Sequence, residues 1–232
     1  YEEGAAEAGY ITWMNFVKAE GMIPYPAMYM TKNCMTNVWS WDNCFGAIFL
    51  SKSHPQLAYG QLMMFARSQA ENGAYDYLNE TYASYSCTNP PIYGWTYDYL
   101  VKENNYFEQD AIINEFYQTI CKQTDFWLEH RMSHIGLPYY THGNDSGWDN
   151  GTFFSKGIPV VAPDLAGFLA YQAECLCRLA KKLNNPEDAL KWKETSDRLL
   201  SLLQEKLWDG ERFRAYLPGT NEWVKEGDTL QA

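Results

Sequence analysis

Residues 142–154, HGNDSGWDNGTFF, combine the residue types that acid–base chemistry needs. Asp145 and Asp149 lie four residues apart, and Trp148 stands beside the second carboxylate. Gly147 between them favours a shaped loop over a helix. A carboxyl group next to an apolar ring can have a raised pKa, which a general acid working near neutral pH requires. These residues alone fit either such an acid or a surface turn rich in Asn, Asp and Gly.

A second segment, NVWSWDNCF (37–45), repeats the Trp-Asp-Asn grouping far from the first in the chain. Trp39 and Trp41 flank Ser40 and would desolvate the neighbouring carboxyl group of Asp42. Two such segments predict one aromatic, acidic pocket formed by both. Asp42 therefore competes with Asp149 for the part of proton donor.

Composition indicates one substantial globular domain spanning residues 1–232. Aromatic residues make up 16% of the chain, with 9 Trp and 18 Tyr, which suits thick helix interfaces or stacking against sugar rings. The net charge of −11 disfavours nucleic-acid and anionic-membrane partners. No run of about 18 apolar residues occurs, so we expect no membrane span.

The six cysteines are too sparse for a disulfide scaffold. Cys175 and Cys177 lie two apart in a predicted helix, where their side chains diverge, so no metal site is expected there. The first residues lack the pattern of a signal peptide. Asn144 and Asn150 are glycosylation sequons, as is Asn79, and a glycan on the loop would block a pocket. The sequons favour a reducing or non-glycosylating compartment, so a cytoplasmic location is expected, with a periplasmic or secreted one left open.

The periodic segments of the chain are helical. Apolar residues recur at three- and four-residue intervals over 55–72, 108–131 and 164–183, and Gly73 is a candidate cap for the first. A further helix over 186–207 is predicted to begin with Asn185 as its cap and Pro186 in its first turn.

The links between these helices alternate in length. Helices 164–183 and 186–207 are joined by only a few residues and must pack as an antiparallel hairpin. The links 73–93 and 132–163 are long and rich in Gly, Pro, Tyr and Asn. This pattern predicts an all-α fold of stacked helical hairpins with the functional residues at one rim. The segment 211–217 is the one candidate for a short strand.

Three segments in order, NVWSWDNCF, NPPIYGW (89–95) and HGNDSGWDNGTFF, resemble glycoside hydrolase family 63. The similarity is greatest to its bacterial mannosylglycerate-hydrolase-like and α-glucosidase-like branch, and it extends from about Met28 to Gly227. VVAPDLAGFLAYQAE (160–174) fits the helix that follows the catalytic loop there.

The resemblance implies an (α/α)6 toroid that hydrolyses α-glycosidic bonds with inversion and without a cofactor or metal. Inversion uses two carboxyl groups about 6.5–9.5 Å apart, one to protonate the leaving oxygen and one to activate water. Asp149 falls at the general-acid position, and a small carbohydrate is the implied substrate. Asp42 falls where the family lines the sugar subsite, and a fixed carboxylate that bonds sugar hydroxyls is the commoner role for such a group. The implied substrate-binding residues are Trp39, Trp41, Asp42, Asn89, Trp95, His142, Gly147 and Trp148.

The chain departs from the family pattern in three ways. The family's general base is a Glu nearer the C-terminus, so we expect this chain to be a fragment whose base lies downstream and whose open toroid leaves apolar helix faces uncovered. Residues 132–135 replace an acidic loop, so no calcium site is expected. Tyr93 stands where relatives carry His, and Asn89 where Gln is common.

Other functions fit the sequence less well. His142, Asp145 and Ser146 lie too close in sequence for a hydrolase triad, and no Gly-x-Ser-x-Gly elbow occurs. Sugar epimerases on helical toroids use paired histidines, whereas this chain has 4 scattered His. Two alternatives stay open: a trehalase-like hydrolase, because trehalases share a similar Glu-Ser-Gly-Trp-Asp motif, and a carbohydrate-binding remnant that binds sugar without turnover.

Overall fold

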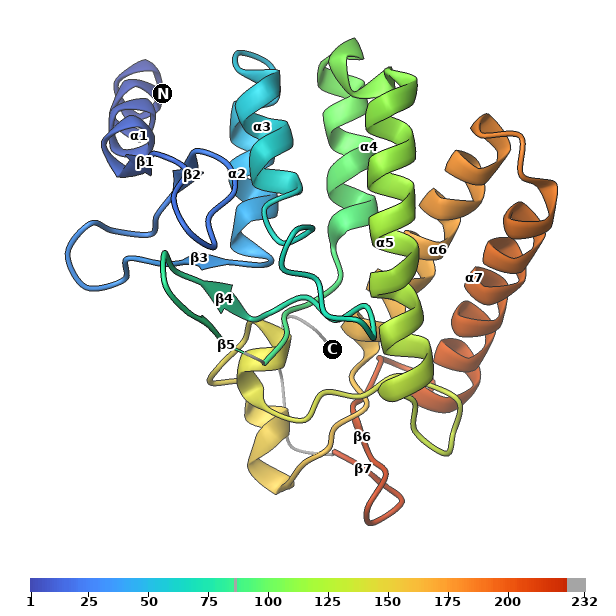
Figure 1. Cartoon of the computed structure of the whole chain (residues 1–232). Helices are drawn as coiled ribbons and strands as arrows, with labels where there is room; N and C mark the ends of the chain where they lie inside the picture. The colour runs from blue at the N-terminus through green and yellow to red at the C-terminus, as the bar shows by residue number, and fades with distance from the viewer. Residues whose placement is uncertain (86, 225–232) are drawn as a thin grey trace.

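The protein is a layer of antiparallel helix pairs with long links gathered at one end (Figure 1). The computed structural model describes residues 1–85 and 87–224. Its helices are α1 (Glu2–Asn15), α2 (Asp42–Leu50), α3 (Pro55–Leu62), α4 (Tyr93–Glu103), α5 (Asp110–His130), α6 (Pro163–Lys182) and α7 (Pro186–Leu207).

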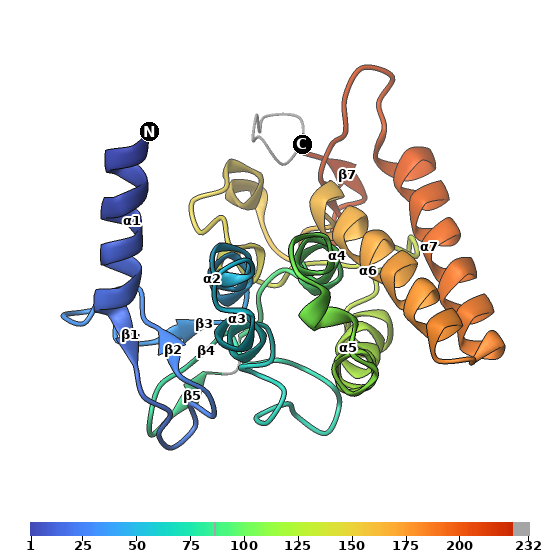
Figure 2. The same ribbon diagram turned by 90° about the horizontal axis from the view of Figure 1, so that it is seen from above.

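The helix pairs stand side by side in an arc (Figure 2). Helices α2, α4 and α6 contact one another in sequence, and α3 and α7 pack against α2 and α6. Tyr97 of α4 stacks on Phe116 of α5 with ring centroids 4.3 Å apart. Helices α2, α4 and α6 are thus the inner helices, and α3, α5 and α7 are the outer ones. This alternation is the order expected in an (α/α)6 toroid.

The predicted hairpin of α6 and α7 is confirmed, and its turn is built as the sequence indicates. The Asn185 side chain accepts a hydrogen bond from the Asp188 backbone N–H at 3.1 Å, and Pro186 occupies the first turn. These are the expected signals of a helix start. Farther along, the Ser196 hydroxyl donates to the Ala170 carbonyl at 2.9 Å and ties the two helices together.

A buried amide joins the three central helices. The Gln172 side chain on α6 donates to Gln123 Oε1 at 2.7 Å and to Thr124 Oγ1 at 2.8 Å, both on α5. Its carbonyl oxygen accepts from the Gly94 backbone N–H on α4 at 3.3 Å. Because every polar atom of this side chain is paired, its burial is compatible with a stable core.

The helix predicted over 55–72 is shorter in the structure, where α3 ends at Leu62. Met63, Met64 and Phe65 follow it and are all fully buried. They lie in turns beyond the end of α3. Gly73 is not the helix cap: it has φ +90° and lies against the Lys122 carbonyl, where a side chain would collide.

The sheets are small and serve as links. Strand β3 (Val38–Trp39) pairs antiparallel with β4 (Leu78–Asn79), which pairs with β5 (Ser84–Tyr85). Two further pairs are β1 (Phe16–Val17) with β2 (Ala27–Met28), and β6 (Tyr216–Leu217) with β7 (Glu222–Trp223). Only the last two residues of the strand predicted over 211–217 belong to a strand.

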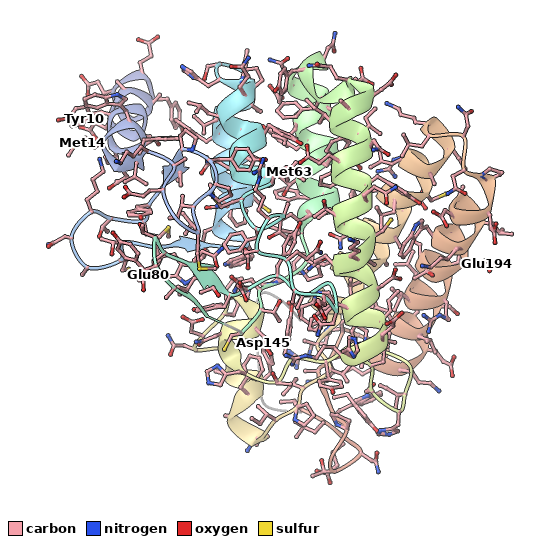
Figure 3. All side chains as sticks on the ribbon, in the orientation of Figure 1. Tyr10, Met14, Met63, Glu80, Asp145 and Glu194 are labelled. Atoms are coloured by element: carbon pink, nitrogen blue, oxygen red, sulfur yellow. The ribbon has the colours of Figure 1, made fainter. Side chains whose placement is uncertain are left out.

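Apolar helix faces remain uncovered, as the sequence predicts. On the inner helices the exposed rings are Phe45 and Phe49 of α2, Trp95 and Tyr99 of α4, and Tyr171 of α6. Helix α1 has no buried residue, and its Tyr10 and Met14 side chains project into solvent (Figure 3).

The packing of α4 on α6 predicts a severe effect of Gly94→Ala. A Cβ at Gly94 would lie 2.8 Å from Gln172 Cα, a backbone atom that cannot give way alone. Overpacking of this kind costs about 1–3 kcal/mol of unfolding free energy. Gly167→Ala in α6 is the matched control, because a Cβ there meets nothing within 4 Å. Urea unfolding should show Gly94→Ala destabilised and Gly167→Ala unchanged or stabilised; equal effects would contradict this account of the helix contact.

Candidate active site

The two Trp-Asp-Asn segments meet at one cleft of about 210 Å³, as the sequence predicts. The cleft lies where β3 runs into α2 and the loop 142–154 folds beneath it. Six residues singled out in the sequence line it, together with three that were not: Met30, Met35, Trp39, Trp41, Asp42, Tyr77, Asn89, Gly147 and Asp149.

The first segment is positioned by a strand that turns directly into a helix. Trp39 ends β3, Trp41 is the N-cap residue of α2, and Asp42 is the first residue of that helix. A carboxylate in the first helical turn is favoured by the partial positive charge of the helix N-terminus. Ser40 is buried between them, and its backbone N–H donates to the Tyr77 carbonyl at 3.1 Å.

The second segment is a loop whose turn depends on glycine. Residues Gly143–Ser146 form a single 3-10 turn, after which Gly147 adopts φ +69°. The Trp41 indole lies directly against this glycine: a Cβ there would be 2.2 Å from Trp41 Cζ2. Gly147 is therefore required both for the backbone conformation and for the approach of the ring. Asp149 follows two residues later at the exposed mouth of the cleft.

The electrostatics of the cleft centre on Asp42. Burial raises the pKa of the Asp42 carboxyl, its own backbone N–H opposes this, and the nearby negative charge of Asp149 adds to the rise. The prediction that the tryptophans desolvate Asp42 agrees with this direction. Tyr77 faces both carboxylates, and burial together with their charges raises its pKa despite a hydrogen bond from the Trp39 side chain.

Three predicted residues, Trp95, Trp148 and His142, do not line this cleft. Trp95 lines a neighbouring apolar groove of about 340 Å³, which Trp41 shares. Trp148 is exposed and lines neither hollow. His142 is also exposed, and its Nδ1 accepts from the Asn144 backbone N–H at 3.1 Å. Asn89 lines the cleft, but both ends of its amide are already bonded to protein.

Sequence reasoning missed Met30, Met35 and Tyr77. The two methionines come from an irregular segment, and Tyr77 from the long link before β4, so no periodicity marks them. The only available signal for Tyr77 was the aromatic composition of the 73–93 link.

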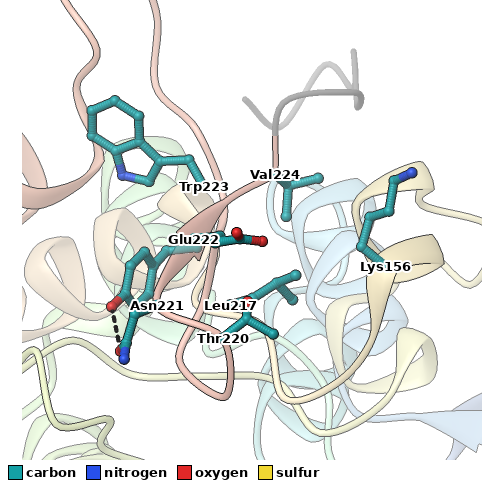
Figure 4. Close-up of a pocket in the computed structure, with 8 residues that line it drawn as sticks. Lys156, Leu217, Thr220, Asn221, Glu222, Trp223 and Val224 are labelled. Carbon is teal, nitrogen blue, oxygen red and sulfur yellow. Dashed lines mark hydrogen bonds between the residues drawn. The ribbon is translucent and has the colours of Figure 1, made fainter.

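A larger hollow of about 700 Å³ lies between the β6–β7 hairpin and the 3-10 turn Thr152–Lys156 (Figure 4). Neither Asp42 nor Asp149 lines it. All six cysteines lie in the described ranges and carry free thiols. Within residues 1–85 and 87–224, no three His, Cys, Asp or Glu side chains group as metal ligands, and no helix is long and apolar enough to cross a membrane.

Solved structures share this fold. A GH63 mannosylglycerate hydrolase from Thermus thermophilus, in complex with Tris and D-glycerate, matches 95% of this chain and 70% of its own, with TM-score 0.79 and 15% identity. Its complex with glucose matches with TM-score 0.78 and 14% identity, over 95% and 70%. Neutral trehalase Nth1 from Saccharomyces cerevisiae matches 94% of this chain and 56% of its own, with TM-score 0.69 and 14% identity. These likenesses define the chain as an (α/α)6-toroid type of structure.

The family follows from the sequence itself. The model of the mannosylglycerate hydrolase MGH1-like glycoside hydrolase domain matches residues 35–230. The chain belongs to this family and is therefore a glycosidase domain, as its resemblance to glycoside hydrolase family 63 indicated. A search of curated protein sequences found no significant match.

The contact of Trp41 with Gly147 predicts that Gly147→Ala disrupts the cleft. The new methyl group would displace the indole, so sugar binding measured by calorimetry should be lost or weakened at least tenfold. Gly210→Ala is the matched control, because Gly210 also has positive φ (+106°) but nothing within 4 Å of its Cβ position. Both variants carry backbone strain, and only the first moves Trp41. Equal sugar affinity in the two variants would contradict the contact.

The raised pKa of Asp42 predicts a stability gain in Asp42→Asn. A carboxyl whose folded-state pKa exceeds its unfolded value of 3.8 favours folding most at low pH, and stability is lost as pH rises through the folded value. Asp42→Asn should therefore raise Tm at pH 7, with a gain that shrinks as the pH falls toward 3.8.

Asp209→Asn provides a control of opposite sign. Backbone N–H groups of Arg212 and Glu211 and the Arg214 side chain lower the pKa of Asp209. Its ionised form therefore stabilises the fold above pH 3.8, and the substitution should lower Tm at pH 7. A Tm difference for Asp42→Asn that is the same at pH 7 and pH 4 would refute the assignment.

Proposed function

We propose that the protein is an inverting hydrolase of α-glycosidic bonds in small glucosides or mannosides. Asp149 is the general acid, and Asp42 is the carboxylate that accepts hydrogen bonds from sugar hydroxyls. The observation that carries the proposal is the convergence of Asp42 and Asp149, from two distant segments, on one cleft walled by Trp39 and Trp41. Indole faces suit the apolar faces of sugar rings, and carboxylates suit their hydroxyls.

The position of Asp149 at the cleft mouth supports its assignment as proton donor. A group that protonates the leaving oxygen has to reach the bond between the enclosed sugar and its departing part. Asp42, the first residue of α2, is less exposed than Asp149 and is the better partner for the enclosed ring. The family resemblance implies a Glu as the water-activating base, and inversion needs about 6.5–9.5 Å between acid and base.

The relatives guide the choice of substrates. The Thermus protein is a mannosylglycerate hydrolase with complexes of glucose and of D-glycerate, and the yeast relative is a trehalase. The substrate panel therefore contains mannosylglycerate, glucosylglycerate, α-linked glucobioses and trehalose. Mannosylglycerate and glucosylglycerate each contain a single anomeric centre, so proton NMR of their fresh product should show the β-anomer first. An α-anomer formed first from either of them would overturn inversion.

Asp149→Asn should abolish hydrolysis of ordinary glycosides in the full-length protein. Loss of a general acid costs about 10²–10⁴-fold in rate. Hydrolysis of the α-glycosyl fluoride of the same sugar should keep its rate, because fluoride departs without a proton. Sugar affinity should change little. Wild-type turnover of the glycoside by Asp149→Asn would sink the assignment.

Asp42→Asn is the companion variant, because the raised pKa of Asp42 makes it the rival proton donor. If Asp42 is a sugar-binding carboxylate, the Asp42→Asn variant should lose activity on the glycoside and on the fluoride alike. If Asp42→Asn instead spares the fluoride and Asp149→Asn does not, the two roles are exchanged. Binding of mono- or disaccharide with no turnover in the full-length protein would favour the carbohydrate-binding alternative.

A further inference from the structure

We propose that Asp145, which touches no cleft surface, is a positioning residue that holds Asp149 in register with Asp42. The inference rests on the proposed function of the cleft. Asp145 lies among the long links at the end of the helix layer (Figure 3) and is 1% exposed. An ionised side chain buried to this extent has to be fully bonded to be stable.

The carboxylate of Asp145 gathers three separate segments. Oδ2 accepts from the Thr141 backbone N–H at 2.8 Å and from the Thr141 hydroxyl at 2.6 Å. Arg131, which caps the end of α5, is 3.5 Å from the same oxygen and donates to the Thr141 hydroxyl at 2.6 Å. Oδ1 accepts from the Thr88 backbone N–H at 3.4 Å. The loop, the end of α5 and the 87–89 segment are therefore fixed to one side chain.

From Thr88 a chain of hydrogen bonds, the first of two arms, continues through the next residue toward Asp42. Asn89, the next residue, donates from Nδ2 to the Asn144 carbonyl at 3.0 Å. Its Oδ1 accepts from the Ser40 hydroxyl at 3.2 Å. Ser40 is followed by Trp41 and Asp42, so this arm ends at the carboxylate at the start of α2.

A second arm leads from the same carbonyl to Asp149. The Asn144 oxygen also accepts from the Gly147 backbone N–H at 3.2 Å. The buried Ser146 hydroxyl donates to the Gly143 carbonyl at 2.7 Å and accepts from the Trp148 backbone N–H at 3.1 Å. The turn is therefore held rigid up to the residue before Asp149. One carbonyl, in the residue that precedes Asp145, is thus the junction of both arms.

This arrangement separates positioning from simple stabilisation. Charge-assisted bonds to a buried carboxylate are strong and directional, so they define where the loop lies and not only whether it folds. An error of about 1 Å in the position of a catalytic group can cost about 100-fold in rate. Loss of the charge on Asp145 should therefore affect the step that needs the proton of Asp149 more than sugar binding.

Asp145→Asn in the full-length protein tests the proposal. The variant keeps the size of the side chain but turns an NH₂ group toward N–H and O–H donors. We expect kcat on the glycoside to fall about 10–100-fold, with KM and the rate on the α-glycosyl fluoride each within about threefold of wild type, the criterion we set for an unaffected step. Asp209→Asn is the matched control, since it also removes an arginine-paired carboxylate (Arg214–Asp209) and lines neither the cleft nor the groove of Trp95. It should lower Tm but leave kcat unchanged.

A second readout does not depend on activity. With 5-fluorotryptophan incorporated, the ¹⁹F resonance of Trp41 reports the contact of its indole with Gly147. This resonance should shift in Asp145→Asn and not in Asp209→Asn. If Asp145→Asn fails to fold, Thr141→Val, which removes only one hydroxyl from the network, should show the same pattern more weakly. Wild-type kcat, or equal losses on glycoside and fluoride, in a folded variant would overturn the proposal. If Asp149→Asn hydrolyses the glycoside like wild type, the proposed function falls. The positioning by Asp145 would still be tested by the Trp41 resonance, which does not depend on activity.

Discussion

The close approach of the Trp41 indole to Gly147 is the contact on which the geometry of the cleft depends. Trp41 directly precedes Asp42, and Gly147 lies two residues before Asp149, so their contact fixes the two carboxylates relative to each other. It also holds two like charges in one partly buried space. The raised pKa of Asp42 is the physical consequence of that placement, since burial and the charge of Asp149 both disfavour its ionised form.

The helices supply the rigid frame for this contact, and the links supply the chemistry. The three-stranded sheet β3-β4-β5 and the loop 142–154 lie at the end where the inner helices begin. Asp42 belongs to α2. The links that contain Thr88 and Asp145 are bonded to each other, and the second link is bonded to Arg131 at the end of α5. Function gathered on loops at one rim of a rigid scaffold follows from this division.

How far the sequence predicts this structure depends on where each side chain is buried. Helices α5, α6 and α7 are amphipathic, and their periodicity marks them within a few residues. Helices α2 and α4 were not predicted, because α2 is apolar on most sides and α4 mixes aromatic and polar residues along its length. The cleft itself was predicted from two short motifs, whereas Trp95, in the first turn of α4, lines a different hollow.

Trp41 belongs to both hollows, and this joins the packing of the inner helices to the acidic cleft. Its ring makes an edge-to-face contact with Phe45 at 5.5 Å, and Phe45 makes another with Trp95 at 6.2 Å. The indole is thus held by Gly147 on the side of the loop and by the rings of α2 and α4 on the side of the groove. Trp41 is also the N-cap residue of the helix that begins with Asp42. The exposed aromatic face of α2 and α4 therefore adjoins the acidic cleft through this one side chain.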